Sequence, residues 1–162
     1  MVNAKCLGFL NRATILQNGE SVDYKTNMWQ TSVGLNSNVH DWLEIDYQLG
    51  YNINSLSFSK AKTSTKLLTQ ALNISFLPIE DLTLTVMAEH YANYFSSLPS
   101  KQTIFSDIRC VYKYHKVDFV GSLTNVFNQK YYNNTSYTDL SSSYRKFSLR
   151  GRTFLLSVVT YF

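Results

Sequence analysis

The sequence contains few charged residues. Asp, Glu, Lys and Arg make up 16% of its 162 residues, and the formal net charge is +4. Roughly 25% charged residues is usual in a soluble globular protein. The basic residues are dispersed, apart from a small group at 145–152. A nucleic-acid-binding surface combines a dense basic stripe with stacking aromatic side chains, so we expect no nucleic-acid partner.

Cysteine and the motifs of enzymes and metal sites are scarce too. Cys6 and Cys110 are far apart and lack CxxC spacing, so one disulfide is arithmetically possible but small apolar side chains are the simpler interpretation. His40, His90 and His115 show no zinc spacing such as HExxH, and the chain has no GxSxG, Walker or GxGxxG motif. We therefore expect no enzyme and no cofactor, although a Ser–His site assembled only by folding would leave no such motif.

Long apolar runs are also absent. No stretch approaches the roughly 20 consecutive apolar residues of a membrane-spanning helix. Near the N-terminus, Asn11 and Arg12 interrupt the only apolar run before it reaches the length of a signal-peptide core. We therefore expect any export signal to lie outside this chain.

Aromatic and other hydrophobic residues are abundant instead, and they follow a period of two. Hydrophobic residues make up 44% of the chain, with 12 Tyr and 10 Phe. Over 43–53 every second residue is apolar and the residues between them are polar or glycine, which is the pattern of a β-strand with two different faces. The apolar row comprises Leu43, Ile45, Tyr47, Leu49, Tyr51 and Ile53.

The same alternation recurs along the chain. It is present over 29–36, 68–76, 82–89, 107–114, 117–124 and 153–162, and less regularly over 4–17. No segment shows the i, i+3, i+4, i+7 spacing of an amphipathic helix. The sequence therefore predicts an all-β fold of about eight antiparallel strands.

The connections between these strands alternate in length. Short turns are expected at 38–42, 77–82 and 114–117, and longer polar links at 17–27, 54–64, 95–102 and 128–151. Outer-membrane β-barrels have tight turns on the periplasmic side and long loops on the outer side. The alternation of short and long connections therefore predicts transmembrane β-barrel strands.

Strand length and residue type favour the same prediction. Several segments alternate for about ten residues, close to the roughly 9–11 that a tilted strand needs to cross the hydrocarbon. Tyr and Trp near strand ends would form interfacial girdles. These residues are Trp29, Trp42, Tyr94, Tyr112, Tyr114 and Tyr161. A polar row opposite the apolar one suits a wet lumen, but it equally suits the exposed face of a soluble sheet.

The segment 122–162 carries a family resemblance. It contains an Asn-hydrophobic-Phe-Asn element followed by two tyrosines, a Gly-Arg pair, and an aromatic last residue. These motif residues are Asn125, Phe127, Asn128, Tyr131, Tyr132, Gly151, Arg152 and Phe162. The segment resembles the end of TonB-dependent outer-membrane receptors, especially the nutrient receptors of Bacteroidetes-type bacteria.

The resemblance implies a nutrient-uptake barrel in the outer membrane of a Gram-negative cell, energised through the TonB system. It also implies that the last strand is the insertion signal read by the barrel-assembly machinery. Its outward row comprises Phe154, Leu156, Val158, Thr160 and Phe162. Outer-membrane lipid and lipopolysaccharide would surround the barrel, and the presence of a surface lipoprotein lid stays open. Because such receptors carry a plug domain and about twenty-two strands, residues 1–162 are expected to be the C-terminal portion, a fragment that reaches TonB through a missing N-terminal part.

Two alternatives remain beside this interpretation. Eight strands are also enough for a complete small outer-membrane barrel filled by side chains, and a soluble β-barrel that binds a ligand fits the alternation as well. Under the receptor interpretation, the loop at 128–151 is the candidate for contact with a ligand. Its tyrosines (Tyr131, Tyr132, Tyr137, Tyr144) would stack on a sugar or peptide, and Arg145, Lys146 and Arg150 would meet lipopolysaccharide phosphates. A solvated loop packed on its neighbours is the alternative.

Overall fold

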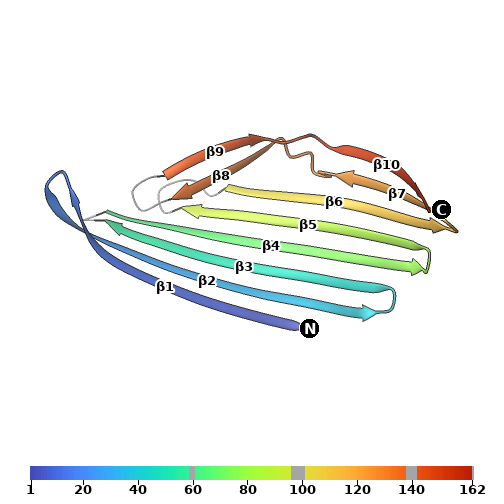
Figure 1. Ribbon diagram of the computed structural model, residues 1–162, viewed down its shortest axis with the longest axis horizontal. Helices are drawn as coiled ribbons and strands as arrows, with labels where there is room; N and C mark the ends of the chain where they lie inside the picture. Colours follow the sequence, from blue (N-terminus) through green and yellow to red (C-terminus); the bar gives the residue numbers. More distant parts are fainter. Residues whose placement is uncertain (59–60, 96–100, 138–141, 162) are drawn as a thin grey trace.

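The computed structural model describes residues 1–58, 61–95, 101–137 and 142–161. Over these ranges the chain consists of ten β-strands, drawn in Figure 1. They are β1 (Val2–Gln17), β2 (Glu20–His40), β3 (Leu43–Phe58), β4 (Ala61–Ile79), β5 (Leu82–Phe95), β6 (Lys101–Tyr114), β7 (Val117–Thr124), β8 (Tyr131–Tyr137), β9 (Ser142–Ser148) and β10 (Thr153–Thr160). The described part of the chain contains no helix long and apolar enough to cross a membrane.

Eight of these strands form one antiparallel sheet. Its order is β1-β2-β3-β4-β5-β6-β7-β10, so every neighbour is consecutive in the chain until β7 pairs with β10. Between them, β8 and β9 pair with each other as a separate hairpin (Figure 1). The predicted all-β, antiparallel fold is confirmed. The prediction of a long polar loop at 128–151 is wrong, because β8 and β9 pair within this segment.

The three predicted short turns are confirmed. Two residues, at 41–42, 80–81 and 115–116, join β2 to β3, β4 to β5 and β6 to β7. The pairing register shifts beside the first two turns, between Asn38 and His40 and between Phe76 and Ile79. His115 adopts a positive φ of 55°, which lets β6 reverse into β7 within two residues.

The predicted long polar links at 17–27 and 54–64 are wrong. β1 and β2 are joined by only Asn18 and Gly19, both with positive φ, in a tight hairpin turn. Likewise β3 continues to Phe58 and β4 begins at Ala61. Hydropathy alternation stops where one face ceases to be apolar, but the backbone ladder needs no apolar side chain to continue. The strands therefore extend well beyond the segments that the alternation marks.

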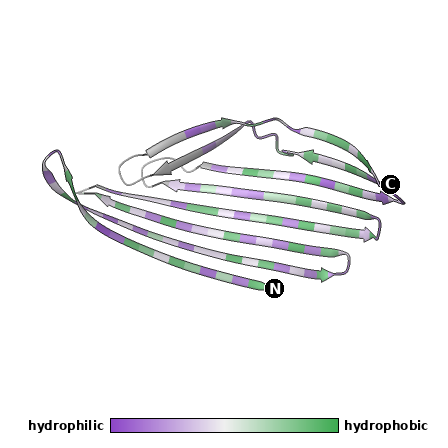
Figure 2. Ribbon diagram, in the orientation of Figure 1, coloured by the Kyte–Doolittle hydropathy of each residue, from purple (hydrophilic) through white to green (hydrophobic). Residues whose placement is uncertain are grey.

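The pairing register places apolar residues of the other strands opposite the apolar row of β3. Residues directly opposite one another lie on the same side. One row runs from Ile45 through Ile74, Val86, Ile108 and Leu123 to Phe154. We call this side, which carries Leu43, Ile45, Tyr47, Leu49, Tyr51, Ile53 and the residues opposite them, the apolar face, and the other side the polar face. Figure 2 shows the alternation along the strands of the large sheet.

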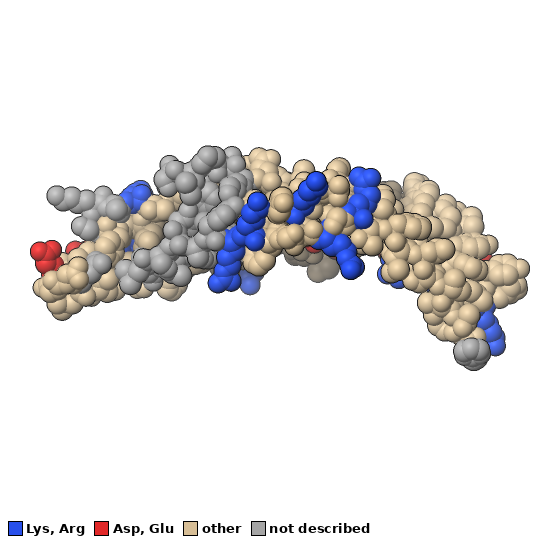
Figure 3. Space-filling model, turned by 90° about the horizontal axis from the view of Figure 1, so that it is seen from above, with Lys and Arg blue, Asp and Glu red and all other residues tan. Residues whose placement is uncertain are grey.

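The sheet has almost no buried core. Among the described residues only Tyr24 and Ala92 are buried hydrophobic side chains. Large apolar side chains of the apolar face are instead exposed, such as Trp29 (50%) and Leu156 (65%). Seen from above in Figure 3, the molecule is bent into an arch, and several Lys and Arg side chains stand out in this view. The sheet is thus a curved wall whose apolar face is uncovered.

Candidate functional site

The site begins where the chain leaves β7. Asn125 has a φ of 54°, and its side chain bonds on both sides of the junction. Its amide oxygen accepts the Gln129 N–H at 2.7 Å, while its amide nitrogen donates to the carbonyls of Gln129 (2.9 Å) and Arg150 (2.8 Å). Its backbone N–H donates to Asp107 Oδ1 at 2.8 Å. Asparagine suits this position because it tolerates the left-handed conformation and bonds nearby backbone groups.

Asn128 and Arg152 complete the junction from the β10 side. Asn128 also has a φ of 54°, and its Oδ1 accepts the Arg152 N–H at 3.1 Å. The Arg152 guanidinium donates twice to the Val126 carbonyl, at 3.0 and 2.6 Å. A Cβ on Gly151 would lie 3.3 Å from Asn128 Oδ1, so a larger residue would crowd this bond. Four predicted motif residues (Asn125, Asn128, Gly151, Arg152) therefore come together as one joint between β7 and β10.

The β8–β9 hairpin carried by this joint packs on the polar face. The Tyr132 ring lies 6.2 Å from that of Tyr91 and 5.9 Å from that of Phe105, and both partners belong to the polar face. Phe147 stacks on Tyr132 at 6.3 Å. The Tyr91 hydroxyl donates to Glu89 at 2.9 Å. An aromatic cluster with one carboxylate at its edge thus attaches the hairpin to the sheet.

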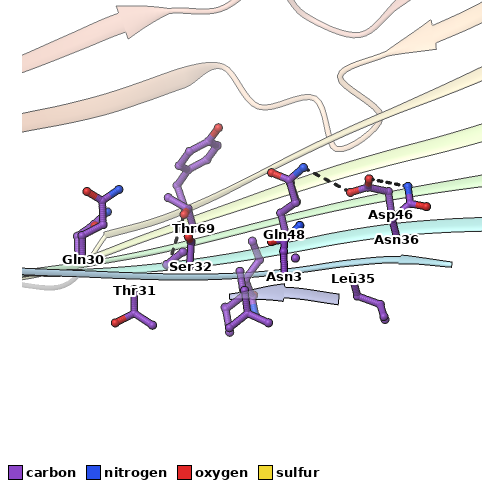
Figure 4. Close-up of a pocket in the computed structure, with 17 residues that line it drawn as sticks. Asn3, Gln30, Thr31, Ser32, Leu35, Asn36, Asp46, Gln48 and Thr69 are labelled. Atoms are coloured by element: carbon purple, nitrogen blue, oxygen red, sulfur yellow. Dashed lines mark hydrogen bonds between the residues drawn. The ribbon is translucent and has the colours of Figure 1, made fainter. Parts of the chain in front are cut away.

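A hollow of about 550 Å³ lies on the polar face and includes Tyr91 in its wall. In Figure 4 the Gln48 amide donates to Asp46 (3.5 Å), which also accepts from Asn36 (3.2 Å). Thr31 points to the opposite side of the sheet. Asp46 is the single charged residue of the described lining, and the rest offers mainly amides and hydroxyls. Such a surface can hydrogen bond a neutral polar ligand.

Comparison with protein-family models, curated proteins and solved structures finds no match to this chain. Function is therefore inferred from the residues and their geometry. Within the described ranges no group of three His, Cys, Asp or Glu side chains could hold a metal ion. Both Cys6 and Cys110 are free thiols.

The other predicted ligand-loop residues lie on the hairpin. Lys146 places its ammonium 3.9 Å from the centre of the Tyr131 ring, a cation–π contact. Arg145 lies opposite Asn134 in the β8–β9 ladder, and Arg150 contributes its carbonyl to Asn125. Tyr137 and Tyr144 belong to the same hairpin by backbone pairing, but their side chains lie outside the described ones. Of the four tyrosines, Tyr132 is thus seen to pack on the sheet. Phe127 is 58% exposed and takes no part in the joint.

The predicted C-terminal row lies on the apolar face. Phe154, Leu156, Val158 and Thr160 pair with β7, whereas Phe162 lies outside the described residues. The alternation, however, understates how apolar β10 is: Leu155 and Val159, on the polar face, are 58% and 42% exposed. Tyr161, just beyond the strand, donates to Asp118 at 3.1 Å. This hydrogen bond to a carboxylate raises the pKa of Tyr161 above 10.0.

Sequence reasoning missed a polar chain inside the apolar face. Gln70 donates to the Tyr47 hydroxyl at 3.0 Å and pairs with His90 Nδ1 at 3.0 Å. These residues come from β3, β4 and β5, so only the register brings them together. The one available signal was Gln70 itself, which breaks the apolar row of its strand.

Proposed function

We propose that this chain is part of the wall of an outer-membrane β-barrel, and specifically the C-terminal barrel segment of a TonB-dependent receptor for nutrient uptake. One observation carries the membrane part of the proposal: an exposed apolar face ends at the same level on neighbouring strands. On β3 the apolar row stops at Ile53 and Ser55 follows; on β2 it stops at Trp29 and Asn27 follows.

The height of the apolar face agrees with a bilayer. The ten steps from Leu43 to Ile53, at about 3.4 Å each, span about 34 Å along the strand. With the roughly 45° tilt of barrel strands this is about 24 Å along the membrane normal, close to the ~25 Å apolar band of outer-membrane barrels. We call the rows from Leu43 to Ile53, with their partners on the other strands, the apolar band.

The edges of the sheet favour a segment over a small closed barrel. β1 and β10 each pair on one side only and do not pair with each other. Both edge strands also expose apolar side chains on the polar face, Leu7 and Phe9 on β1 and Leu155 and Val159 on β10. Unpaired backbone in lipid costs several kcal/mol per group. Further strands on both sides would satisfy these groups and cover these side chains.

The receptor part of the proposal rests on the resemblance of 122–162 and on the joint that its residues build. Side-chain hydrogen bonds cross the β7–β10 junction: Asn125 donates to the Arg150 carbonyl, and Asn128 accepts the Arg152 N–H, beside Gly151. This contact set gives a physical reason for the spacing of the motif. The amide-lined hollow and the hairpin on the polar face would then lie on the lumen side, where a polar nutrient passes.

A flotation experiment tests the membrane part. The chain is diluted from urea into phosphatidylcholine vesicles, which are then washed with urea and floated on a density gradient. We expect β-structured protein to float and to resist the wash, because strands that span the bilayer cannot be stripped from its surface. A chain that folds as a β-structured monomer in water and stays out of the vesicles would support the soluble alternative and end the proposal.

A further inference from the structure

Four basic side chains gather on the apolar face at and beyond the end of the apolar band. They are Arg12, Lys25, Lys62 and Lys66, and all four are exposed. Lys66 lies opposite Ile53, the last apolar residue of β3 on the apolar face, and Lys62 is four residues further out. Among the described residues, the same surface carries one carboxylate, Asp23, which accepts a hydrogen bond from Thr14 at 2.9 Å. Positive charge therefore dominates this part of the face.

Register places these cations side by side. Arg12 lies directly opposite Lys25, and Lys25 and Lys62 flank Ser57 on the strand between them. Like charges directly opposite each other in a sheet are destabilising. A hollow beside this pair is lined by Arg12, Thr14, Lys25 and Ser57, and by one carboxylate, Asp23. An anion bound there would turn the repulsion between Arg12 and Lys25 into attraction and could accept a hydrogen bond from the Ser57 hydroxyl.

The opposite end of the band has the reverse charge. The tight turns at 41–42, 80–81 and 115–116 contain three carboxylates, Asp41, Glu80 and Asp81, against one lysine, Lys116, and no arginine. Lys66 lies in the Ile53 row at one edge of the apolar band. Apart from Lys66, the described rows of the band carry no Asp, Glu, Lys or Arg. The two boundaries of the band therefore differ in the sign of their charge, and the end opposite the turns at 41–42, 80–81 and 115–116 is the one that attracts anions.

We propose that Arg12, Lys25 and Lys62 form a binding site for the phosphate groups of a phosphorylated glycolipid headgroup. This inference rests on the proposed membrane location. Lys62 stands four residues, about 13 Å along the strand, beyond the last apolar row, and a lysine can lay its stem on apolar surface while its ammonium stays in the headgroup layer. The acyl chains of the glycolipid would cover the apolar band while its phosphates bind the cations. One molecule would thus contact both the apolar band and the basic site.

The test compares two triple variants that lose the same charge. Arg12→Gln/Lys25→Gln/Lys62→Gln removes the site, and Lys5→Gln/Arg109→Gln/Lys113→Gln removes one Arg and two Lys from the polar face. Binding of a fluorescent diphosphorylated glucosamine glycolipid, and of its dephosphorylated form, is measured by anisotropy in neutral detergent. Each cation near an anionic lipid surface contributes about fivefold in affinity. The first variant should bind the phosphorylated probe roughly 100-fold more weakly, and the second should bind it like the wild type.

Every outcome separates the two proposals. Equal losses in both variants, or equal binding of the dephosphorylated probe, would overturn the site while leaving the membrane proposal intact. Displacement of the probe by millimolar inorganic phosphate would show an anion site that does not select lipid, and would overturn it too. If the wild type fails to float with vesicles, both proposals fail. Should the triple variant not fold, Lys25→Gln serves alone, with about a fivefold loss expected and an unchanged affinity overturning the site.

Discussion

Asn125 stabilises the joint between β7 and β10 through its backbone conformation and through its side-chain hydrogen bonds. It combines a left-handed backbone with three side-chain hydrogen bonds, two to the Gln129 backbone and one to the Arg150 carbonyl on the segment that leads into β10. Asparagine and glycine both tolerate this conformation, but only asparagine can form the bonds. The two contributions can therefore be separated by substitution.

We predict that Asn125→Gly lowers the free energy of unfolding in detergent by about 2 kcal/mol, since hydrogen bonds of this kind contribute about 1 kcal/mol each and part of the site is open to solvent. Asn125→Ala should lose about 1 kcal/mol more, because alanine is strained at positive φ. Urea titrations followed by circular dichroism measure both values. Equal stability of Asn125→Gly and wild type would show that the side-chain bonds contribute nothing.

The hydrogen bond between Tyr161 and Asp118, near the turn at 115–116, should make the stability of the fold depend on pH. Its hydrogen bond to Asp118 raises the phenol pKa, so the folded state holds the proton more tightly than the unfolded state does. The resulting stabilisation is complete below the ordinary pKa near 10 and disappears as the pH rises through the raised value.

The measurement is an NMR titration of the chain labelled with ¹³Cζ-tyrosine, in which Tyr161→Phe assigns the resonance. We expect Asp118→Asn to return the Tyr161 midpoint towards 10. A midpoint that does not respond to this substitution would mean that the carboxylate is not the cause. Asp23→Asn is the control, because Asp23 lies at the other end of the sheet and bonds Thr14.

At the scale of elements, the β8–β9 hairpin is attached to the sheet by few contacts. Tyr132 meets Tyr91 and Phe105, whereas its neighbour Tyr131 is 49% exposed and contacts Lys146 on the hairpin itself. Aromatic pairs contribute roughly 0.5–1.5 kcal/mol each beyond their buried area. Removing one ring should therefore loosen a whole element.

We expect Tyr132→Ala to accelerate amide exchange in β8 and β9 by roughly 30-fold, the equivalent of about 2 kcal/mol, without changing exchange in β3 to β5. Hydrogen–deuterium exchange mass spectrometry resolves these peptides. Tyr131→Ala is the matched control and should leave exchange near the wild-type rate. A uniform acceleration in both variants would mean that Tyr132 does not attach the hairpin.

The strands also show which features the hydropathy alternation does not predict. Alternation over 43–53 identifies β3 and its faces correctly, but it ends at the level where the apolar band ends. β3 itself runs five residues further, to Phe58, because its ladder with β2 and β4 continues regardless of side-chain hydropathy. The pairing of β10 with β7, with a hairpin between them in sequence, is likewise invisible to a pattern that describes one strand at a time.

At the scale of the whole molecule, the proposed membrane location rests on the difference between the apolar face and the polar face. An apolar face without a cover and a hollowed polar face are what a barrel wall presents to lipid and lumen. A charge placed in the band should then be costly only on one side. Leu72 and Ala71 are neighbours on β4 that point to the apolar and polar faces respectively.

We predict that Leu72→Lys weakens insertion into phosphatidylcholine vesicles by about 2–4 kcal/mol, the cost of a lysine at the midplane of a barrel wall. Ala71→Lys should insert like the wild type, because its ammonium would face the polar side near Glu89, the residue opposite it on β5. Urea-dependent insertion followed by tryptophan fluorescence measures the difference. If the two variants lose the same amount, the apolar face does not contact lipid.

The sequence by itself determined the eight strands of the sheet, their two faces and three of the tight turns, because a period of two and a two-residue reversal are local properties of the chain. Only the tertiary structure decided that Asn125 and Arg152 share one joint, that Tyr132 rests on the polar face, and that Gln70 bonds across the sheet. It also brought Arg12 opposite Lys25 and Lys62 to the same surface. These contacts depend on the register between segments far apart in the chain, and register is set by the pairing of whole strands.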